Sequence, residues 1–164
     1  MSNSTLVKEQ TQSRPWLSAW VPVAIWLLII AFESTPLMGA DHTSGPLRWL
    51  MEIFHGPFTT RQWWYWHLVV RKTGHVVGYG ILSVLMFRAV WMTFRINAGV
   101  VLRELMTHFL AIAGTFLVAS LDEFHQTFLP NRTGLFSDVL IDTGGALVGQ
   151  TLILIWFWTR RPQD

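Results

Sequence analysis

Residues Pro15 to Phe32 read PWLSAWVPVAIWLLIIAF, a stretch without a single charged side chain. Its length lies at the lower end of the roughly 17–25 apolar residues that a helix needs to cross a bilayer. Because backbone groups at that depth find no water to bond, a spanning segment has to be helical. A cleaved signal peptide is the alternative, but no A-x-A-like cleavage site follows, since Met38 precedes Gly39-Ala40. We therefore predict an uncleaved transmembrane helix.

Three further stretches share this apolar character. They lie between Lys72 and Arg88 with a continuation towards Phe94, between Glu104 and Asp122, and between Asp142 and Arg160. The alternating ten-residue strands that a membrane β-barrel requires do not occur. The sequence thus predicts an all-α, polytopic membrane protein with four transmembrane helices, organised as one domain over residues 1–164.

The composition agrees with a membrane location and excludes several kinds of partner. The chain is 51% hydrophobic and only 13% charged, whereas soluble domains carry about 25% charged residues. The net charge is +2 and no basic run exceeds two residues, so we expect no nucleic-acid partner, because that binding needs a dense basic patch. Cysteine is absent, which excludes disulfides, iron–sulfur clusters and thiolate catalysis.

Four spans place both termini on the same side of the membrane, and the positive-inside rule indicates which side that is. The side of the termini carries seven basic residues: Lys8, Arg14, Arg88, Arg95, Arg103, Arg160 and Arg161. The other side carries five: Arg48, Arg61, Arg71, Lys72 and Arg132. We therefore predict a protein of the cytoplasmic (inner) membrane with cytoplasmic termini, a cytoplasmic tail over residues 1–14 and an outer loop over residues 34–66.

The outer loop contains the pattern of an interfacial amphipathic helix between the first and second spans. Pro46 is tolerated in the first turn of a helix that starts near Ser44, and Gly56-Pro57 would end it. Arg48 and Glu52 are spaced to pair at i,i+4. Four apolar residues recur at helical spacing: Leu47, Leu50, Met51 and Phe54. Such a helix is typical of segments that lie on the membrane surface.

The run Trp63-Trp64-Tyr65-Trp66 follows this helix. Aromatic residues of this kind gather at the level of the lipid headgroups, where their amphipathic rings are stable. We interpret the run as a membrane anchor. A platform on which a carbohydrate stacks is the alternative interpretation.

Polar and charged residues near the spans gather on the outer side of this predicted topology. They are Glu33, Lys72, His75, Asp122, Glu123, His125, Gln126, Arg132, Asp138 and Asp142. Only His108 lies towards the other side. A charged side chain within a membrane costs about 2.5–3.5 kcal/mol on insertion scales, so these groups should pair with one another or line a cavity.

Helical spacing arranges these residues further. Lys72, His75 and Tyr79 are at i, i+3 and i+7 and share one helix face. Along the fourth span, one stripe begins with the acids Asp138 and Asp142 and continues with two glycines, Gly145 and Gly149. Glycines at this spacing allow close helix packing in lipid.

Two acids lie where a helix disfavours them. Asp122 and Glu123 are at the C-terminal end of the third span, where negative charge opposes the helix dipole by about 0.3–1 kcal/mol. We therefore expect cationic partners for them, and the nearest candidates in membrane depth are Lys72, Arg71 and Arg132.

Several roles remain open for single residues. Asp138 lies in a first helical turn, where an acid is favoured structurally, while Asp142 is deeper and fits a functional or network-forming role. His75 could be a hydrogen-bonded packing residue, an acid/base group or a metal ligand. No ligand pair such as H-E-x-x-H supports a metal site, so none is predicted. Arg132 could bind a phosphate or carboxylate, or form a salt bridge with a nearby acid.

Two segments resemble the signatures of VanZ-like membrane proteins. The segment RKTGHVVGYGILSVLMFRA is similar to the family pattern K-x-x-H-x-x-x-Y-G-x-L, through Lys72, His75, Tyr79, Gly80 and Leu82. The segment LDEFHQTFLPNRTGLFSDVLIDTGGALVG is similar to the pattern D-E-x-x-Q-x-F-x-x-x-R…D-x-x-x-[ND]-x-x-G. Its matches are Asp122, Glu123, Gln126, Phe128, Arg132, Asp138, Asp142, Gly145 and Gly149. The resemblance covers roughly residues 16–158, and Asp142 stands where many relatives carry Asn.

The resemblance implies an envelope-facing membrane protein but no defined reaction and no known cofactor. The family takes its name from a protein that confers resistance to teicoplanin, a lipid-anchored glycopeptide. The implied partners are membrane lipids and a lipid-linked cell-wall precursor or glycopeptide. The sequence does not indicate an oligomeric state.

Three hypotheses follow for the polar cluster. In the first, it binds or modifies a lipid headgroup or envelope ligand, with His75, Glu123 or Asp122 as general acid/base. The ligand-binding residues would be Lys72, Tyr79, Gln126, Arg132, Asp138 and Asp142. In the second, the cluster only fixes helix packing in an accessory protein. In the third, it belongs to an ion-coupled transporter.

Overall fold

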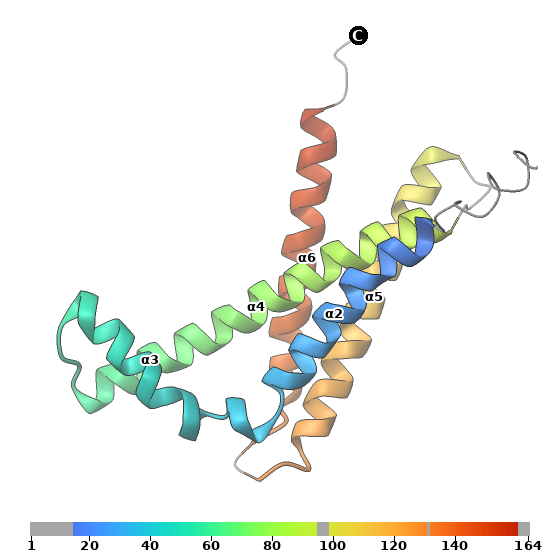
Figure 1. Ribbon diagram of the computed structural model, residues 1–164. Coiled ribbons are helices and arrows are strands. Elements are labelled where there is room, and N and C mark those ends of the chain that lie inside the picture. Colours follow the sequence, from blue (N-terminus) through green and yellow to red (C-terminus); the bar gives the residue numbers. More distant parts are fainter. Residues whose placement is uncertain (1–14, 95–98, 131, 161–164) are drawn as a thin grey trace, which may run out of the picture.

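The fold is all-helical, as the hydropathy pattern predicts. The computed structural model describes residues 15–94, 99–130 and 132–160. Its helices are α2 (Pro15–Glu33), the short 3₁₀ helix η1 (Pro36–Met38), α3 (Ala40–His55), α4 (Thr60–Thr93), α5 (Val100–Gln126) and α6 (Phe136–Thr159). Four of them, α2, α4, α5 and α6, are long and apolar enough to cross a membrane. Their arrangement confirms the predicted fold class (Figure 1).

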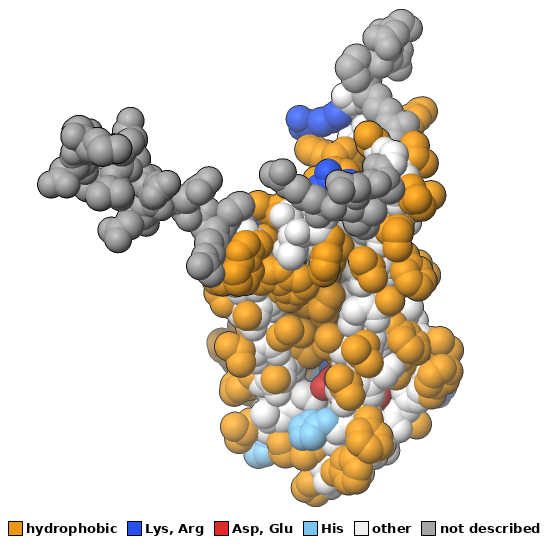
Figure 2. Space-filling model, turned by 90° about the vertical axis from the view of Figure 1, so that its right-hand side faces the viewer, with side chains coloured by type: hydrophobic (Ala, Val, Ile, Leu, Met, Phe, Trp, Pro, Cys, Tyr) orange, Lys and Arg blue, Asp and Glu red, His pale blue; other side chains and the backbone are white. Residues whose placement is uncertain are grey.

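Helix α4 is the central element of the bundle, because it packs against α2, α5 and α6. Two indole groups join it to α2, because Trp26 Nε1 donates to the carbonyl of Gly78 and Trp20 Nε1 donates to Thr93 Oγ1, both at 2.8 Å. Elsewhere the bundle presents apolar side chains outward, and they cover most of the face seen in Figure 2. In that view, acidic and histidine side chains surface towards the lower end of the molecule.

The contact between α4 and α6 depends on glycine, as the small-residue stripe predicts. A Cβ atom added to Gly145 would overlap the backbone carbonyl of Val76, and one added to Gly149 would lie 2.7 Å from the carbonyl oxygen of Gly80. Glycine therefore lets the two backbones approach more closely than any other residue would.

Two predicted boundaries are wrong. Helix α4 begins at Thr60, well before Lys72, because the aromatic run continues the helix. Thr59 and Gln62 cap its start in a reciprocal capping box. Helix α3 begins at Ala40 and so encloses Pro46, which was expected in the first turn. Its end at His55 agrees with the prediction, since Gly56 adopts the positive φ of 84° that favours glycine.

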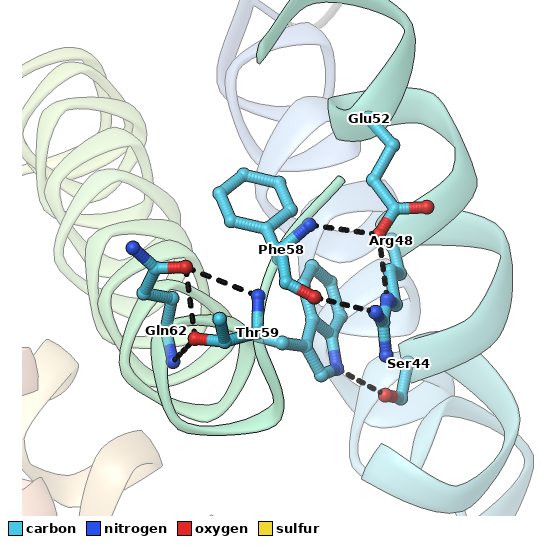
Figure 3. Close-up of polar contacts among 7 residues, drawn as sticks. Ser44, Arg48, Glu52, Phe58, Thr59 and Gln62 are labelled. Carbon is cyan, nitrogen blue, oxygen red and sulfur yellow. Dashed lines mark hydrogen bonds and ion pairs between the residues drawn. The ribbon is translucent and has the colours of Figure 1, made fainter. Parts of the chain in front are cut away.

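Helix α3 folds back on the start of α4 to form a hairpin at one side of the bundle (Figure 1). Arg48 Nε lies 2.8 Å from Glu52 Oε1, which confirms the predicted i,i+4 pair. The same two side chains bond the backbone of Phe58 (Figure 3), with Arg48 donating to its carbonyl and Glu52 accepting from its N–H. Trp63 Nε1 donates to Ser44 Oγ at 2.8 Å.

This last contact alters the interpretation of the aromatic run. Trp63 is buried against α3, whereas Trp64, Tyr65 and Trp66 are exposed. The exposed three have the character of a membrane anchor. The buried Trp63 instead attaches α3 to α4.

Seven basic residues supported the predicted orientation, and four of them, Lys8, Arg14, Arg95 and Arg161, lie outside the described residues, as does the predicted tail over residues 1–14.

Candidate functional site

A polar cleft opens where α4, α5 and α6 meet at the end of the bundle that holds the α5–α6 connection. Its volume is about 260 Å³. The polar residues that line it are Arg71, Lys72, His75, Glu123, Gln126, Arg132, Thr133, Asp138 and Asp142. This set contains all the predicted site residues except Tyr79 and Asp122, together with two that were not assigned to the site, Arg71 and Thr133. We call the cavity that these residues line the polar cleft.

The shared face of Lys72, His75 and Tyr79 brings each of these residues to a different acid. Lys72 Nζ lies 3.0 Å from Asp138 Oδ1. Both side chains remain partly open to solvent, so this pair contributes little to stability, typically about 0–1 kcal/mol.

The pair formed by His75 and Asp142 is far more enclosed. His75 Nδ1 lies 3.2 Å from Asp142 Oδ1, and the Asp142 side chain is completely buried. The pair has ion-pair distance but not hydrogen-bond geometry, since neither carboxylate oxygen of Asp142 has a hydrogen-bond partner within the described chain. Among the described residues, His75 is the only base within ion-pair distance of Asp142, and it compensates a buried carboxylate only when its ring is protonated.

Tyr79 and Asp122 lie beside the polar cleft rather than in it. The Tyr79 hydroxyl donates to Asp122 Oδ2 at 3.0 Å, and Gln126 Nε2 donates to the same oxygen at 3.1 Å. They line a smaller pocket of about 30 Å³ between α2, α4 and α5, together with Ser34 and His75.

The cationic partners expected for Asp122 and Glu123 are not observed among the described residues. Neutral donors replace them, because Asp122 accepts from Tyr79 and Gln126, and Glu123 Oε2 accepts from the backbone N–H of Leu135 at 2.8 Å. Leu135 ends the α5–α6 connection, which folds back over the end of α5. The acids at this helix end are thus satisfied by hydrogen bonds that sequence spacing could not reveal.

Arg132 does not form, with any described residue, the salt bridge that was one interpretation of its role, and binding of a phosphate or carboxylate stays a prediction. Its guanidinium donates to the carbonyls of Glu33 and Thr35 at 2.9 and 3.0 Å, and it forms no salt bridge with any described acid. These carbonyls lie at the end of α2, where a helix leaves acceptors without intrahelical partners. Burial lowers the pKa of Arg132 and the nearby Arg71 lowers it further, while the acids Asp122 and Glu123 act in the opposite direction. An anion in the polar cleft would offset the repulsion between Arg132 and Arg71.

A second buried polar group occupies the other half of the bundle, and only its His108 drew attention in the sequence. His108 Nδ1 lies 2.6 Å from Gln150 Oε1, and Gln150 Nε2 donates to both the carbonyl and the hydroxyl of Ser83. Gln150 is the residue whose sequence context could have indicated this network, since it is an isolated amide within the apolar fourth span. The network joins α4, α5 and α6 through one side chain from each.

Within the described residues, no group of three or more His, Asp or Glu side chains is arranged to hold a metal ion. The polar cleft itself offers acids, bases and hydrogen-bond donors.

Comparison with known proteins identifies the family to which the chain belongs. The model of the VanZ/LLP1 family matches residues 18–157, which is most of the chain. No curated protein and no solved structure matches it. Both motif segments that build the polar cleft fall inside the matched range, and the chain belongs to the VanZ/LLP1 family.

Proposed function

We propose that this protein acts at the outer face of the cytoplasmic membrane, where its polar cleft binds or modifies the headgroup of a lipid-linked or other envelope ligand. One observation carries the proposal: acids and bases from three helices surround a cleft of about 260 Å³ at a single end of the bundle. Charged groups at membrane depth are costly, and such groups usually serve a ligand or pathway.

The family name supports a biological setting for this activity. A role in resistance to teicoplanin, or in maintenance of the cell envelope, fits a cleft that faces the outer leaflet. The partner is then a membrane lipid, a lipid-linked cell-wall precursor or the glycopeptide itself. If the site is catalytic, His75 is the best placed acid/base group, because it lines the polar cleft and pairs with Asp142.

A second candidate is a purely structural role in an accessory membrane protein. It is favoured by the extent to which the polar groups bond one another, as in the Lys72–Asp138 pair and the Tyr79–Asp122 hydrogen bond. Under this alternative, every substitution that weakens function should also weaken the fold.

Arg71 separates the two candidates. It lines the polar cleft, yet it forms no hydrogen bond or ion pair with a described residue, so its removal should leave the fold intact. We expect Arg71→Ala to lower teicoplanin resistance in a susceptible host while the melting temperature in detergent stays unchanged. His75→Ala and Glu123→Ala should abolish resistance, and their melting temperatures show how much of that loss is structural.

Arg61→Ala is the matched control, because Arg61 is exposed on the same helix and does not line the polar cleft. Full resistance in all well-folded cleft variants would overturn the binding proposal. Losses of resistance that follow the melting temperature alone would support the structural role.

A further inference from the structure

The charges in the polar cleft do not all compensate one another. Two pairs are internally neutralised: Lys72 with Asp138 at 3.0 Å, and His75 with Asp142 at 3.2 Å. These four residues supply the walls of the cleft but have little charge left for a ligand. The charges that remain come from Arg71, Arg132 and Glu123.

The two remaining arginines differ in what already holds them. Arg71 has no hydrogen-bond or ion-pair partner among the described side chains. Arg132 is oriented by two carbonyls of the α2 end, and its Nε is buried without a partner. Two guanidinium groups in one cleft, neither paired with a carboxylate, suit the oxygens of a phosphate.

Glu123, the remaining acid, gives the cleft a preference for a cationic group in addition to the anion that the arginines favour. Glu123 is 4% exposed, and only one of its carboxylate oxygens has a hydrogen bond, to the N–H of Leu135. Asp122 and Asp138 are nearby acids that add repulsion at Glu123, and the nearby Arg132 offsets part of it. A cation with N–H donors beside Glu123 would offset that repulsion and fill the remaining acceptor positions.

We propose that the polar cleft recognises a phospholipid whose headgroup joins a phosphate to a primary ammonium, as in phosphoethanolamine. The phosphate lies between Arg71 and Arg132, and the ammonium donates to Glu123. This assignment rests on the proposed function, that the cleft binds a headgroup, and adds the chemical class of the ligand.

The size of the cleft supports a small headgroup. Its volume of about 260 Å³ is below the roughly 300–1,000 Å³ of pockets that enclose drug-sized ligands. Leu68 and Ile141 line it beside the polar groups, so an apolar wall is available where a headgroup joins its glycerol. The position at the end of four membrane-spanning helices makes a lipid of the surrounding leaflet the source.

Binding of short-chain phospholipids to the purified full chain in detergent tests the assignment. The probes are phosphatidylethanolamine, phosphatidylglycerol and phosphatidylcholine with matched acyl chains, and free phosphoethanolamine. We expect phosphatidylethanolamine to bind about tenfold more tightly than phosphatidylglycerol, the effect of one charge-assisted hydrogen bond. Phosphatidylcholine should bind as weakly or more weakly, because its quaternary ammonium has no N–H to donate.

Two variants assign the two halves of the headgroup. Glu123→Gln keeps an acceptor for the Leu135 N–H but loses the charge, so it should remove the preference for phosphatidylethanolamine and leave phosphatidylglycerol binding unchanged. Arg71→Ala should weaken both lipids about tenfold, while Arg61→Ala should weaken neither.

The outcomes separate this inference from the proposed function. Phosphatidylglycerol could bind at least as tightly as phosphatidylethanolamine while its binding still depends on Arg71. That result would overturn the ammonium site but leave a cleft that binds headgroups. Free phosphoethanolamine binding as tightly as the lipid would overturn the lipid source. If the Arg71→Ala substitution weakens the binding of none of the probes, both the inference and the proposed headgroup site are overturned.

Discussion

At the scale of single residues, the site is built from one helix face that meets three separate acids. Lys72, His75 and Tyr79 follow one another along α4, but the environments of their contacts differ sharply. The Lys72–Asp138 pair is partly exposed, whereas Asp142 is fully buried beside His75. We therefore expect the effect of each contact on the free energy of unfolding to increase from the mouth of the bundle towards its core.

The hydroxyl of Tyr79 gives a direct test of that gradient. Tyr79→Phe removes its donor to Asp122 and leaves the carboxylate with Gln126 alone. Because hydrogen bonds to charged groups contribute about 1.5–3 kcal/mol, we expect a loss of that size in the free energy of unfolding. Reversible denaturation in mixed micelles measures it. The matched control is Tyr65→Phe, since Tyr65 is exposed. Equal effects of the two substitutions would contradict the assignment.

At the scale of helices, two contacts define where the elements lie. The α3–α4 hairpin is held by Arg48, Glu52 and Phe58 (Figure 3), and the α4–α6 crossing is held by close backbone approach at glycine. The first contact is polar and partly exposed, and it includes the titratable Glu52, so pH controls it. The second is steric, so the size of a side chain controls it.

Acid should release the α3–α4 hairpin before it unfolds the bundle. The hydrogen bond from Arg48, followed by that from the Phe58 N–H, holds the pKa of Glu52 below its ordinary value. A lowered pKa in the folded state means that the contact stabilises the hairpin above the pKa of the unfolded chain. That stabilisation is lost as the pH falls through the folded pKa. We expect a lower amide-exchange protection factor at Phe58, relative to the unstructured chain at the same pH, in this range and in Glu52→Gln at neutral pH. Protection of Phe58 that does not change with acid would contradict this account.

Adjacent glycines in α6 should respond oppositely to the same substitution. A Cβ at Gly145 meets the carbonyl of Val76, whereas a Cβ at Gly144 meets nothing within 4 Å. We expect Gly145→Ala to lower the free energy of unfolding by about 1–3 kcal/mol, the usual cost of overpacking. Gly144→Ala should raise it by up to about 1 kcal/mol through helix propensity. Thermal unfolding of both variants decides the matter, and equal melting temperatures would exclude a close approach at Gly145.

The helices and their faces could be predicted from sequence, but several contacts between them could not. Long apolar stretches fix four spans, and spacing fixes which residues share a face, as for Lys72, His75 and Tyr79. Spacing does not fix how neighbouring helices are rotated, so Asp122 was assigned a cationic partner and instead bonds Tyr79. The role of Arg132 depends on where the α5–α6 connection meets the end of α2, far away in the sequence.

At the scale of the whole molecule, the polar side chains form two groups along the bundle. The polar cleft lies at one end, and the His108–Gln150–Ser83 network lies within the other half. The network is small and its amide is fully bonded, although His108 Nε2 is buried without a partner among the described residues, so it fits a role in holding α4, α5 and α6 together. The polar cleft is larger, and it leaves Arg71 and Asp142 with unused hydrogen-bonding capacity. A ligand therefore belongs at the cleft end of the bundle.

The proposed function requires that the cleft end face outward, and α6 allows this to be measured. Its 24 residues extend about 36 Å at 1.5 Å per residue, enough to cross a hydrocarbon core of about 30 Å. Exposed residues at its two ends, Ser137 and Thr159, should then lie on opposite sides of the membrane. The chain contains no cysteine, so a single introduced thiol reports one position. We expect an impermeant maleimide to label Ser137→Cys in intact cells, and to label Thr159→Cys only after permeabilisation. The reverse pattern would place the polar cleft at the cytoplasmic face, where an outer-leaflet ligand could not reach it.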